Sequence, residues 1–393
     1  MRFFIVLLCN SCLAQEVAGI KTALFVPDPL PLIEARLHGT FEPAQGVLAD
    51  RVSYSTEYGL RVPAIVYRPK RSGPRYPAFV VVNGHGGDKS SWYAYWTGIA
   101  FARLGAVVLT YDPIGEGERN IQHKSGTRAH DRYVPPPEMG RRMGGLMVTD
   151  ISQAVSYLIQ RDDVDPNRIS AGGYSMGSFI LSLACAVETR LKACVLVGGG
   201  NLDGPGGYWD SSSKQMCQSI PYKALEFLGD RPASLYELQS RHAATFVFNG
   251  SGDETVDIVH HGEAFFHELR ERTLKKAVDP SKVFTYAFSE GSGHRPYWVT
   301  QPVVEWLHQQ LVFPMWKKPE LTHISAWAAA SKFPMDVQYA TEHREGGTMA
   351  VGTNVPAIDR DALNALTRQE WELQKDRFIL EKWLEISKTK LAH

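Results

Sequence analysis

Short apolar runs alternate with segments of helix length along most of this chain. The runs are continuous rather than alternating with polar residues, which is typical of strands buried on both faces of a sheet. They lie at residues 78–82, 106–111, 169–172, 193–197, 244–249 and 283–288. Helical patterns are found near 96–104 and at 150–160, between strand candidates. This order predicts an α/β fold, with a mostly parallel central sheet and helices on both faces.

The two ends of the pattern differ from its middle. Residues 51–68 alternate and turn once, which predicts an antiparallel strand pair. Near the other end, Thr367-Arg368-Gln369-Glu370 matches a capping box, so we expect a helix of about twenty residues to follow it to Lys388. Apolar side chains along this helix would pack on the body of the protein or on a second subunit, and the sequence leaves both open, including a homo-oligomer.

The first residues indicate export. Met1-Arg2 precedes an apolar run and a small-x-small signal that ends at Ala14, which predicts a signal peptide and a secreted or periplasmic protein. A buried N-terminal strand is the alternative. We expect the parts of the chain to be a signal peptide (1–14), an N-terminal extension (15–50), a catalytic domain (51–310) and a C-terminal extension with a terminal helix (311–393).

Composition excludes some partners. Lysine plus arginine and aspartate plus glutamate both number 42, so the formal net charge of zero gives no basic footprint for nucleic acid. No internal stretch is long and apolar enough to span a membrane. After the leader is removed, Cys185 and Cys194 lie in apolar runs and are expected to be buried thiols, while Cys217 lies in a polar loop. These three cysteines indicate neither a disulfide framework nor a metal site, and we expect no metal and no cofactor.

The strongest chemical motif is Gly173-Tyr174-Ser175-Met176-Gly177. It has the G-x-S-x-G form, and it stands between a predicted strand and an apolar segment of helix length. A nucleophilic serine needs such a tight turn to project its oxygen, and glycines on both sides avoid collisions there. The N-terminus of the following helix would favour a developing oxyanion. We therefore predict that Ser175 is a catalytic nucleophile.

A serine nucleophile needs a base and an acid that orients it. His294 follows the last predicted strand in a glycine loop and is the candidate base. Asp253 follows the strand at 244–249 and is the candidate acid, with Glu254 and Asp257 as rivals. The chain order of serine, aspartate and histidine is that of the nucleophile-elbow enzymes.

An oxyanion hole also needs backbone donors. Asn83-Gly84-His85-Gly86-Gly87 follows the strand at 78–82, and its glycines allow close approach to a carbonyl. We assign one donor to the backbone of Met176 and the other to Gly87, with Gly86 as the alternative. His85 is expected to support the loop.

Two long segments should cover the serine, because both follow the carboxyl ends of strands. These predicted lid segments are 120–147 and 198–241. Candidate substrate contacts are Trp92, Tyr208, Trp209 and Arg141. The aromatic rings suit sugar rings or aromatic esters, although Trp92 could equally pack in a helix. The arginines Arg128, Arg132, Arg141 and Arg142 could hold an acidic group such as a uronate, and a solvated basic loop is the alternative.

The chain resembles the α/β-hydrolase superfamily between about residues 51 and 310, and within it the dienelactone hydrolase and acetyl xylan esterase-like group, which is related to the prolyl oligopeptidase catalytic domain. The resemblance rests on the following motifs: His85-Gly86-Gly87, Tyr111-Asp112-Pro113-Ile114-Gly115-Glu116-Gly117-Glu118-Arg119, the run from Val164 into Gly173–Gly177, Gly250–Asp253 and Gly293-His294. The Asp112–Arg119 loop is expected to be structural, with ion pairs inside it. Ser178 departs from the pattern, since many relatives have glycine there.

The resemblance implies an exported serine esterase that uses no cofactor and acts on a small-molecule or carbohydrate ester, most closely of the acetyl xylan type. Two alternatives remain at this point. One is a prolyl-oligopeptidase-like serine peptidase, and the other is an inactive binding protein that has kept the fold.

Overall fold

The computed structural model describes residues 15–71, 73, 75–132, 136–294, 299–316, 348–349 and 358–391. The predicted signal peptide therefore lies outside the described residues. Among the described residues, no helix has the length and apolar character needed to cross a membrane.

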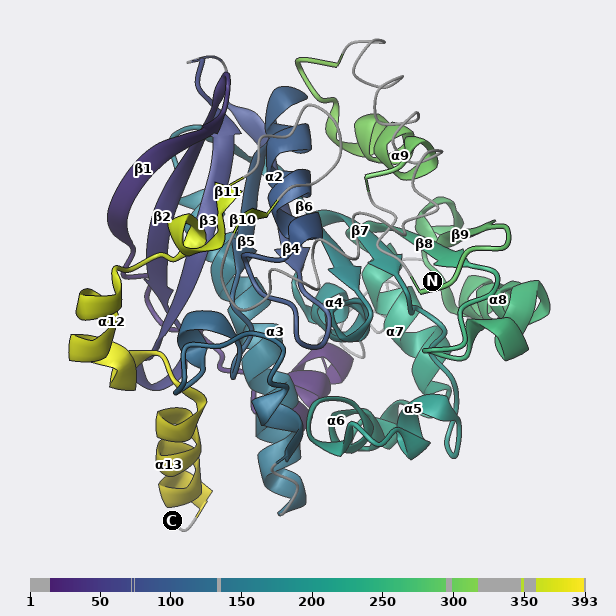
Figure 1. The fold of residues 1–393 in the computed structure, drawn as a ribbon. Coiled ribbons are helices and arrows are strands. Elements are labelled where there is room, and N and C mark those ends of the chain that lie inside the picture. Colours follow the sequence, from purple (N-terminus) through teal and green to yellow (C-terminus); the bar gives the residue numbers. More distant parts are fainter. Residues whose placement is uncertain are drawn as a thin grey trace.

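A nine-stranded sheet forms the centre of the molecule (Figure 1). Its order is β1-β2-β3-β5-β4-β6-β7-β8-β9. The strands are β1 (Arg36–Ala44), β2 (Val47–Ser55), β3 (Arg61–Pro69), β4 (Tyr76–Val82), β5 (Val107–Tyr111), β6 (Val164–Tyr174), β7 (Leu191–Val197), β8 (Ala244–Gly250) and β9 (Thr285–Ser289). The pairs β1–β2, β2–β3 and β3–β5 are antiparallel. The remaining pairs, from β5–β4 to β8–β9, are parallel.

The predicted mostly parallel sheet is therefore confirmed, and so is the antiparallel pair, which is β2 and β3. Strand β1 was not expected. It lies within the stretch 15–50 that the sequence assigns to an N-terminal extension, so the sheet begins before residue 51. Residues 15–24 form a helix that precedes it.

Helices cover both faces of the sheet and divide the core in two. The main helices are α2 (Trp92–Arg103), α3 (Pro137–Ile159), α4 (Met176–Val187), α7 (Arg231–Ser240), α8 (Ile258–Lys276) and α9 (Gln301–Leu311). One core cluster lies under α3, α4, α7 and α8, and the other lies under α2 and α9. Strand β4 serves both, because Phe79 and Val81 point to the second cluster while Val80 and Val82 point to the first.

The predicted lid segments contain regular structure. Helix α3 begins at Pro137, so the end of segment 120–147 is helical rather than loop. Segment 198–241 contains α5 (Tyr208–Ser211), the π-helix η4 (Gln215–Ser219), α6 (Ile220–Lys223), the 3-10 helix η5 (Glu226–Leu228) and α7. The 3-10 helices η2 (Gly117–Arg119) and η3 (Ala129–Arg132) precede α3.

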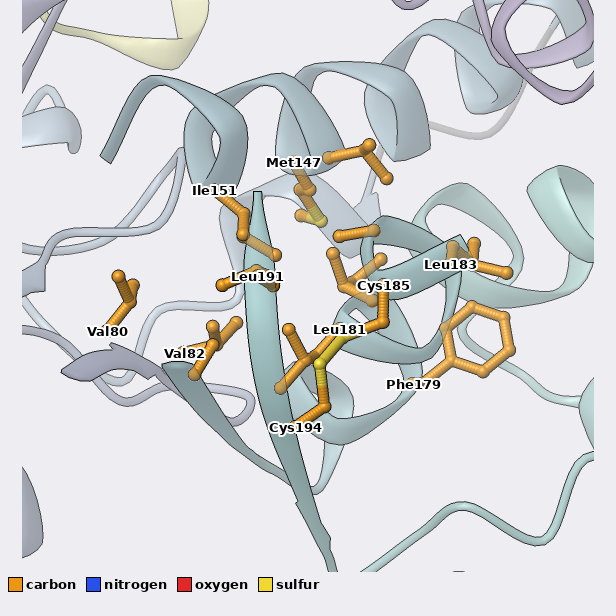
Figure 2. Packing of buried hydrophobic residues seen from close by; sticks show 14 of the residues in the cluster. Val80, Val82, Met147, Ile151, Phe179, Leu181, Leu183, Cys185, Leu191 and Cys194 are labelled. Carbon is orange, nitrogen blue, oxygen red and sulfur yellow. A yellow bond between two sulfur atoms is a disulfide. The ribbon is translucent and has the colours of Figure 1, made fainter. Parts of the chain in front are cut away.

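The cysteine prediction is wrong for two residues. Cys185 on α4 and Cys194 on β7 form a disulfide, where the sequence analysis expected two buried thiols (Figure 2). Both residues are fully buried, and the strand at 193–197 packs directly against the helix that follows the serine turn. The cysteines are nine positions apart in the sequence, and the apolar character of both runs hid their pairing. Cys217 is a free, buried cysteine.

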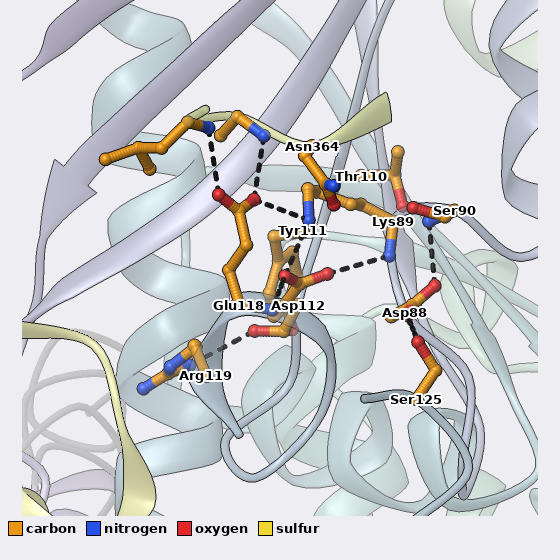
Figure 3. A network of polar contacts seen from close by, with 12 residues as sticks. Asp88, Lys89, Ser90, Thr110, Tyr111, Asp112, Glu118, Arg119, Ser125 and Asn364 are labelled. Atoms are coloured by element: carbon orange, nitrogen blue, oxygen red, sulfur yellow. Dashed lines mark hydrogen bonds and ion pairs between the residues drawn. The ribbon is translucent and has the colours of Figure 1, made fainter. Parts of the chain in front are cut away.

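A buried ion network lies beyond the carboxyl ends of β4 and β5 (Figure 3). Lys89 Nζ is 2.7 Å from both Asp112 Oδ2 and Glu118 Oε2, and all three side chains are at most 1% exposed. Arg360 of the C-terminal segment joins the network through Asp88, at 2.8 Å. We call these five residues the Lys89 network. The buried ion pairs give the Asp112–Arg119 loop a structural role, but the prediction that the pairs lie inside the loop is wrong, because their partners are Lys89 and Asp150.

The Lys89 network holds the C-terminal segment on the body of the protein. Glu118 accepts hydrogen bonds from the backbone of Ala365 (2.7 Å) and Leu366 (2.8 Å), and its own carbonyl accepts one from Trp371 Nε1 (2.8 Å). Trp383 Nε1 donates to Glu57 at 3.3 Å. The segment therefore packs on the body, the first of the two alternatives that the sequence left open.

The predicted terminal helix is broken. The capping box of Thr367 and Glu370 is confirmed, but the helix that it starts, α12 (Arg368–Gln374), ends early. The 3-10 helix η8 (Lys375–Arg377) follows, and then α13 (Leu380–Leu391). The break allows Trp371 and Phe378 to be buried in one small cluster while Trp383 enters the main core, which one straight helix would not permit.

Candidate active site

Ser175 occupies a sharp turn between β6 and α4. Its backbone has φ 55° and ψ −119°, a conformation that residues with a Cβ adopt only at a cost of about 1–3 kcal/mol. The Ser175 N–H donates to the carbonyl of Val197 at the end of β7, at 2.8 Å, which fixes the turn against the neighbouring strand. The predicted strand, turn and helix are all present.

The two motif glycines are required by close packing. A Cβ added at Gly173 would lie 2.4 Å from the carbonyl oxygen of Gly177. A Cβ at Gly177 would lie 2.2 Å from the carbonyl oxygen of Val82 on β4. Backbone atoms cannot move aside cheaply, so only glycine fits at either position.

The candidate acid and base are bonded to each other. His294 Nδ1 lies 2.7 Å from Asp253 Oδ2. The Asp253 side chain is fully buried, and its other oxygen accepts a hydrogen bond from the Thr255 N–H at 2.9 Å. Of the rival acids, Glu254 is exposed and Asp257 pairs with His260. The structure thus places Asp253, and neither of the two rival acids, against His294.

The His294 ring lies directly over Gly198, the residue after β7. A Cβ at Gly198 would be 2.8 Å from His294 Cε1 and 3.0 Å from Nδ1. Because Ser175 donates its N–H to the residue before Gly198, the imidazole is held beside the serine turn. The ring of Tyr174 lies 4.9 Å from the His294 ring, centroid to centroid. Sequence reasoning did not single out Gly198, although the run of three glycines that it begins was a usable signal.

The loop after β4 packs against the serine turn. A Cβ at Gly84 would be 3.0 Å from the carbonyl oxygen of Tyr174 and 3.2 Å from Ser175 Cβ. The Gly87 N–H, which the sequence assigned to the oxyanion hole, instead donates to the Gly84 carbonyl at 3.0 Å. The Gly87 N–H is therefore already used within a turn, which argues against Gly87 as the second oxyanion donor.

Other backbone donors are better placed. Within the described part of the chain, the N–H groups of His85 and Gly86 donate no hydrogen bond. Met176 is the first residue of α4, where a backbone N–H has no partner within its helix. The loop thus retains Gly86, the alternative from the sequence, and adds His85.

The predicted substrate aromatics have different environments. Trp209 is fully buried, stacks on Phe179 at 4.6 Å and donates its indole N–H to the Asn201 carbonyl, so it is part of the core. Trp92, the first residue of α2, is only 7% exposed and belongs to the second core cluster. Tyr208 is partly exposed, and its hydroxyl donates to the Thr255 carbonyl at 2.8 Å, in the turn that carries the acid.

The arginines also separate. Arg141 Nε donates to the Ala23 carbonyl at 2.6 Å, and its guanidinium lies over the ring of Phe25, so it holds the N-terminal segment rather than a substrate. Arg142 lies over the same ring. Arg128 is the arginine near the candidate site, since its Nε would be 3.9 Å from a Cβ at Gly86.

A second polar group borders the same loop. His85, His130, Asp131 and Cys217 each offer one donor atom, and these atoms lie within 4.8 Å of one another. The sequence predicted no metal, and that prediction remains untested.

The chain is similar to several known hydrolases. Residues 137–315 match the prolyl oligopeptidase family. The chain is 30% identical over 146 residues to the "Putative hydrolase YtaP" of Bacillus subtilis, covering 34% of this chain and 47% of that protein. The match therefore spans about half the length of that relative.

Two solved structures superpose on most of the chain. Methylesterase BT1017 has a TM-score of 0.53 at 18% identity, covering 84% of this chain and 74% of its own. A structure described as a putative acetyl xylan esterase from Bacteroides fragilis has a TM-score of 0.53 at 12% identity, covering 72% of this chain and 75% of its own. At identities this low, the two superpositions show a shared fold and do not by themselves show a shared activity.

Proposed function

We propose that this chain is a serine hydrolase of the α/β-hydrolase type that cleaves carboxylic esters, which its match to the prolyl oligopeptidase family over residues 137–315 and its mostly parallel sheet support. One observation carries the proposal. His294, hydrogen-bonded to Asp253, lies over Gly198, beside a serine held in a strained backbone conformation.

In the proposed mechanism, His294 removes the proton from Ser175 Oγ as the oxygen attacks the ester carbonyl. Asp253 accepts the Nδ1–H of His294, which leaves Nε2 as the base and stabilises the imidazolium that forms. His294 then protonates the leaving alcohol. Water enters by the same route and releases the acid from the acyl-enzyme.

The oxyanion would be held by backbone donors. Met176 supplies one N–H at the start of α4, where the helix dipole adds to its effect. The second donor is His85 or Gly86, since Gly87 is used in the turn. Each donor is expected to contribute about a hundredfold or more in rate.

The substrate is proposed to be a carbohydrate ester, of the acetyl xylan type. The fold shared with a structure described as a putative acetyl xylan esterase supports this class, and the fold shared with a methylesterase supports ester hydrolysis. Arg128, near the loop after β4, would favour a substrate that also carries a carboxylate, such as a uronate. A prolyl-oligopeptidase-like peptidase is the second candidate, because that family matches residues 137–315.

We further propose that the protein is exported. The predicted leader supports this, and so does the Cys185–Cys194 disulfide, because disulfides persist in oxidising compartments. Mass spectrometry of the protein from the extracellular or periplasmic fraction tests both features. We expect a chain that starts near residue 15 and whose mass is lower by two hydrogens than that of the fully reduced chain. An intact leader together with free thiols in that fraction would refute the proposal.

The deciding experiment compares Ser175→Ala with Ser182→Ala on a substrate panel. The panel holds acetylated xylo-oligosaccharides, aryl acetates, uronic acid methyl esters, glucuronoyl esters and proline amides. Ser175→Ala is expected to lose at least about a thousandfold in kcat. Ser182, whose hydroxyl donates inside α4, should tolerate alanine. Hydrolysis of proline amides alone would favour the peptidase, and no hydrolysis by the wild type would favour a binding protein.

A further inference from the structure

Four potential metal ligands meet beside the loop that follows β4. His85 lies in that loop, His130 and Asp131 lie on η3, and Cys217 lies on the π-helix η4. His130 and Cys217 are fully buried, and the side chains of His85 and Asp131 are 9% and 11% exposed. Three segments that are distant in sequence thus converge on one point.

Four of the six separations between donor atoms are close to the edges of a coordination tetrahedron, and all six are within 4.8 Å. Asp131 Oδ1 is 3.3 Å from His85 Nε2 and 3.5 Å from His130 Nε2. Cys217 Sγ is 3.2 Å from both His85 Nε2 and Asp131 Oδ1. Bond lengths of about 2.0–2.3 Å around tetrahedral zinc give edges of about 3.3–3.6 Å. Small side-chain adjustments would therefore admit an ion at the centre.

Hydrogen bonding leaves the group incomplete. His130 Nδ1 is 3.1 Å from the Ile114 carbonyl, so Nδ1 carries the hydrogen and Nε2 presents a lone pair. That lone pair faces the Asp131 carboxylate, which is also an acceptor. Among the described residues, His130 Nε2 is buried without a hydrogen-bond partner, and Asp131 Oδ2 has only Lys214 Nζ near it, at 4.0 Å.

With its hydrogen on Nδ1, the His130 imidazole is in the neutral form that binds metals through Nε2. The Nδ1–H contact with a backbone carbonyl is the kind of outer contact that orients a histidine ligand.

We propose that His85, His130, Asp131 and Cys217 bind one divalent transition-metal ion, for which zinc is the best match. Two imidazoles, a carboxylate and a thiolate suit zinc and exclude magnesium and calcium, which prefer oxygen ligands. Four protein ligands indicate a structural site. On binding, the Cys217 thiol releases its proton to solvent as the metal–sulfur bond forms, and both imidazoles bind through Nε2, so the His85 ring hydrogen moves from Nε2 to Nδ1.

The ion would fasten the loop after β4 to η3 and η4. This consequence rests on the proposed function, because His85 stands between Gly84, which packs on Ser175, and Gly86. A fixed His85 would fix the backbone N–H groups proposed for the oxyanion hole. The proposed ion would thus position the loop after β4 by joining it to both predicted lid segments.

Metal content of the full-length protein is the direct test. We expect about one equivalent of zinc per chain by elemental analysis, removed by a strong chelator and restored by zinc. Cobalt added to the metal-free protein should give ligand-field bands and a thiolate-to-cobalt charge-transfer band. Cys217→Ser should lose that band, and Asp131→Asn should lower the affinity for cobalt at least about tenfold.

Matched controls keep the result interpretable. His267→Gln removes an exposed histidine on α8 and should bind metal like the wild type. Circular dichroism checks that the variants fold, and the cobalt spectrum of the wild type needs no variant at all. A folded wild type that holds no metal and binds neither zinc nor cobalt would overturn the proposal, as would unchanged binding by Cys217→Ser.

The two proposals fail separately. Ser175→Ala should bind metal like the wild type, since the serine is not a ligand. An active protein without metal affinity would refute the metal site alone. A metal-binding protein that hydrolyses nothing on the panel would refute the esterase alone. Removal of the metal is expected to lower kcat more than it changes KM, together with a lower melting temperature.

Discussion

Two buried polar groups lie beyond the carboxyl ends of strands in the same sheet, and they differ in how far their side chains are covered from solvent. In the Lys89 network, Lys89 lies between two carboxylates, and Arg360 neutralises Asp88. Burial lowers the pKa of Lys89, but Asp112 and Glu118 outweigh it, so the net shift is upward. In the candidate active site, Asp253 is paired with His294, whose side chain is 15% exposed.

This difference explains why similar residue types at strand ends have different uses. The C-terminal segment covers the Lys89 network, so its ions stabilise the fold and reach no substrate. The candidate triad keeps a partly exposed base next to a strained serine, so it can exchange protons with a ligand. Variants on each side should therefore separate activity from stability.

The largest effect is expected from Asp253→Asn. The amide would hold the wrong tautomer of His294, so kcat should fall about ten-thousandfold with little change in stability. Asp257→Asn is the matched control, because Asp257 pairs with His260 and should tolerate the change. Steady-state kinetics on the best ester of the panel checks both. If Asp257→Asn had the larger effect, the acid would be misassigned.

The opposite profile is expected from Lys89→Met. It would leave Asp112 and Glu118 buried without their cation, and the free energy of unfolding should drop by about 3–5 kcal/mol. Urea unfolding measures this, and kcat per folded molecule should change far less. Lys70→Met breaks an ion pair whose lysine is 56% exposed, so it should cost less than about 1 kcal/mol. Equal effects of the two variants would mean that the network contributes nothing special.

The sequence was sufficient for the features that depend on local pattern. Continuous apolar runs predicted the parallel strands, and the capping box predicted the start of α12. The acid and the base could be proposed because each follows a strand whose end is fixed by the fold. The sequence could not decide which of the three candidate acids pairs with His294, and the structure shows that it is Asp253.

Features that depend on contacts between distant segments could not be predicted. Nothing local to Glu118 indicates that residues 365 and 366 will bind it. The Cys185–Cys194 disulfide was missed because each cysteine lies in a run whose apolar character already explained its burial. The Gly87 donor was misassigned because the turn that uses its N–H is set by how the loop packs on the serine turn.

A smaller effect on catalysis is expected from Gly198→Ala. The added Cβ would displace the His294 ring, and a shift of about 1 Å costs about a hundredfold in kcat. Backbone strain also contributes, because Gly198 has φ +62°. Gly46→Ala is the control for strain, since Gly46 has φ +79° with no atom within 4 Å of the added Cβ. Comparable stability losses with a large difference in kcat would support the assigned place of His294, whereas equal kcat values would refute it.

The smallest expected effect concerns Glu57, a buried carboxyl group that the C-terminal segment contacts through Trp383. Among the described residues it forms no salt bridge, and only Trp383 and Thr149 donate to its carboxyl, both at 3.3 Å. Burial raises the pKa of Glu57 from 4.5 to about 7. The folded state therefore binds more protons than the unfolded state between these values, and stability must fall as the pH rises through this window. From pH 5 to pH 7 the loss from this group is about 2 kcal/mol.

Glu57→Gln should remove this share of the pH dependence, as measured by urea unfolding at both pH values. Burial also raises the pKa of Glu116 to about 7, so some of the slope should remain in the variant. Glu381→Gln, at an exposed position on α13, should retain the whole slope. If Glu57→Gln and the wild type lost equal stability between pH 5 and pH 7, the Glu57 carboxyl would be ionised in the fold. The fold would then tolerate a buried carboxylate that has no cation partner, which would contradict the reason given for the loss of stability in Lys89→Met.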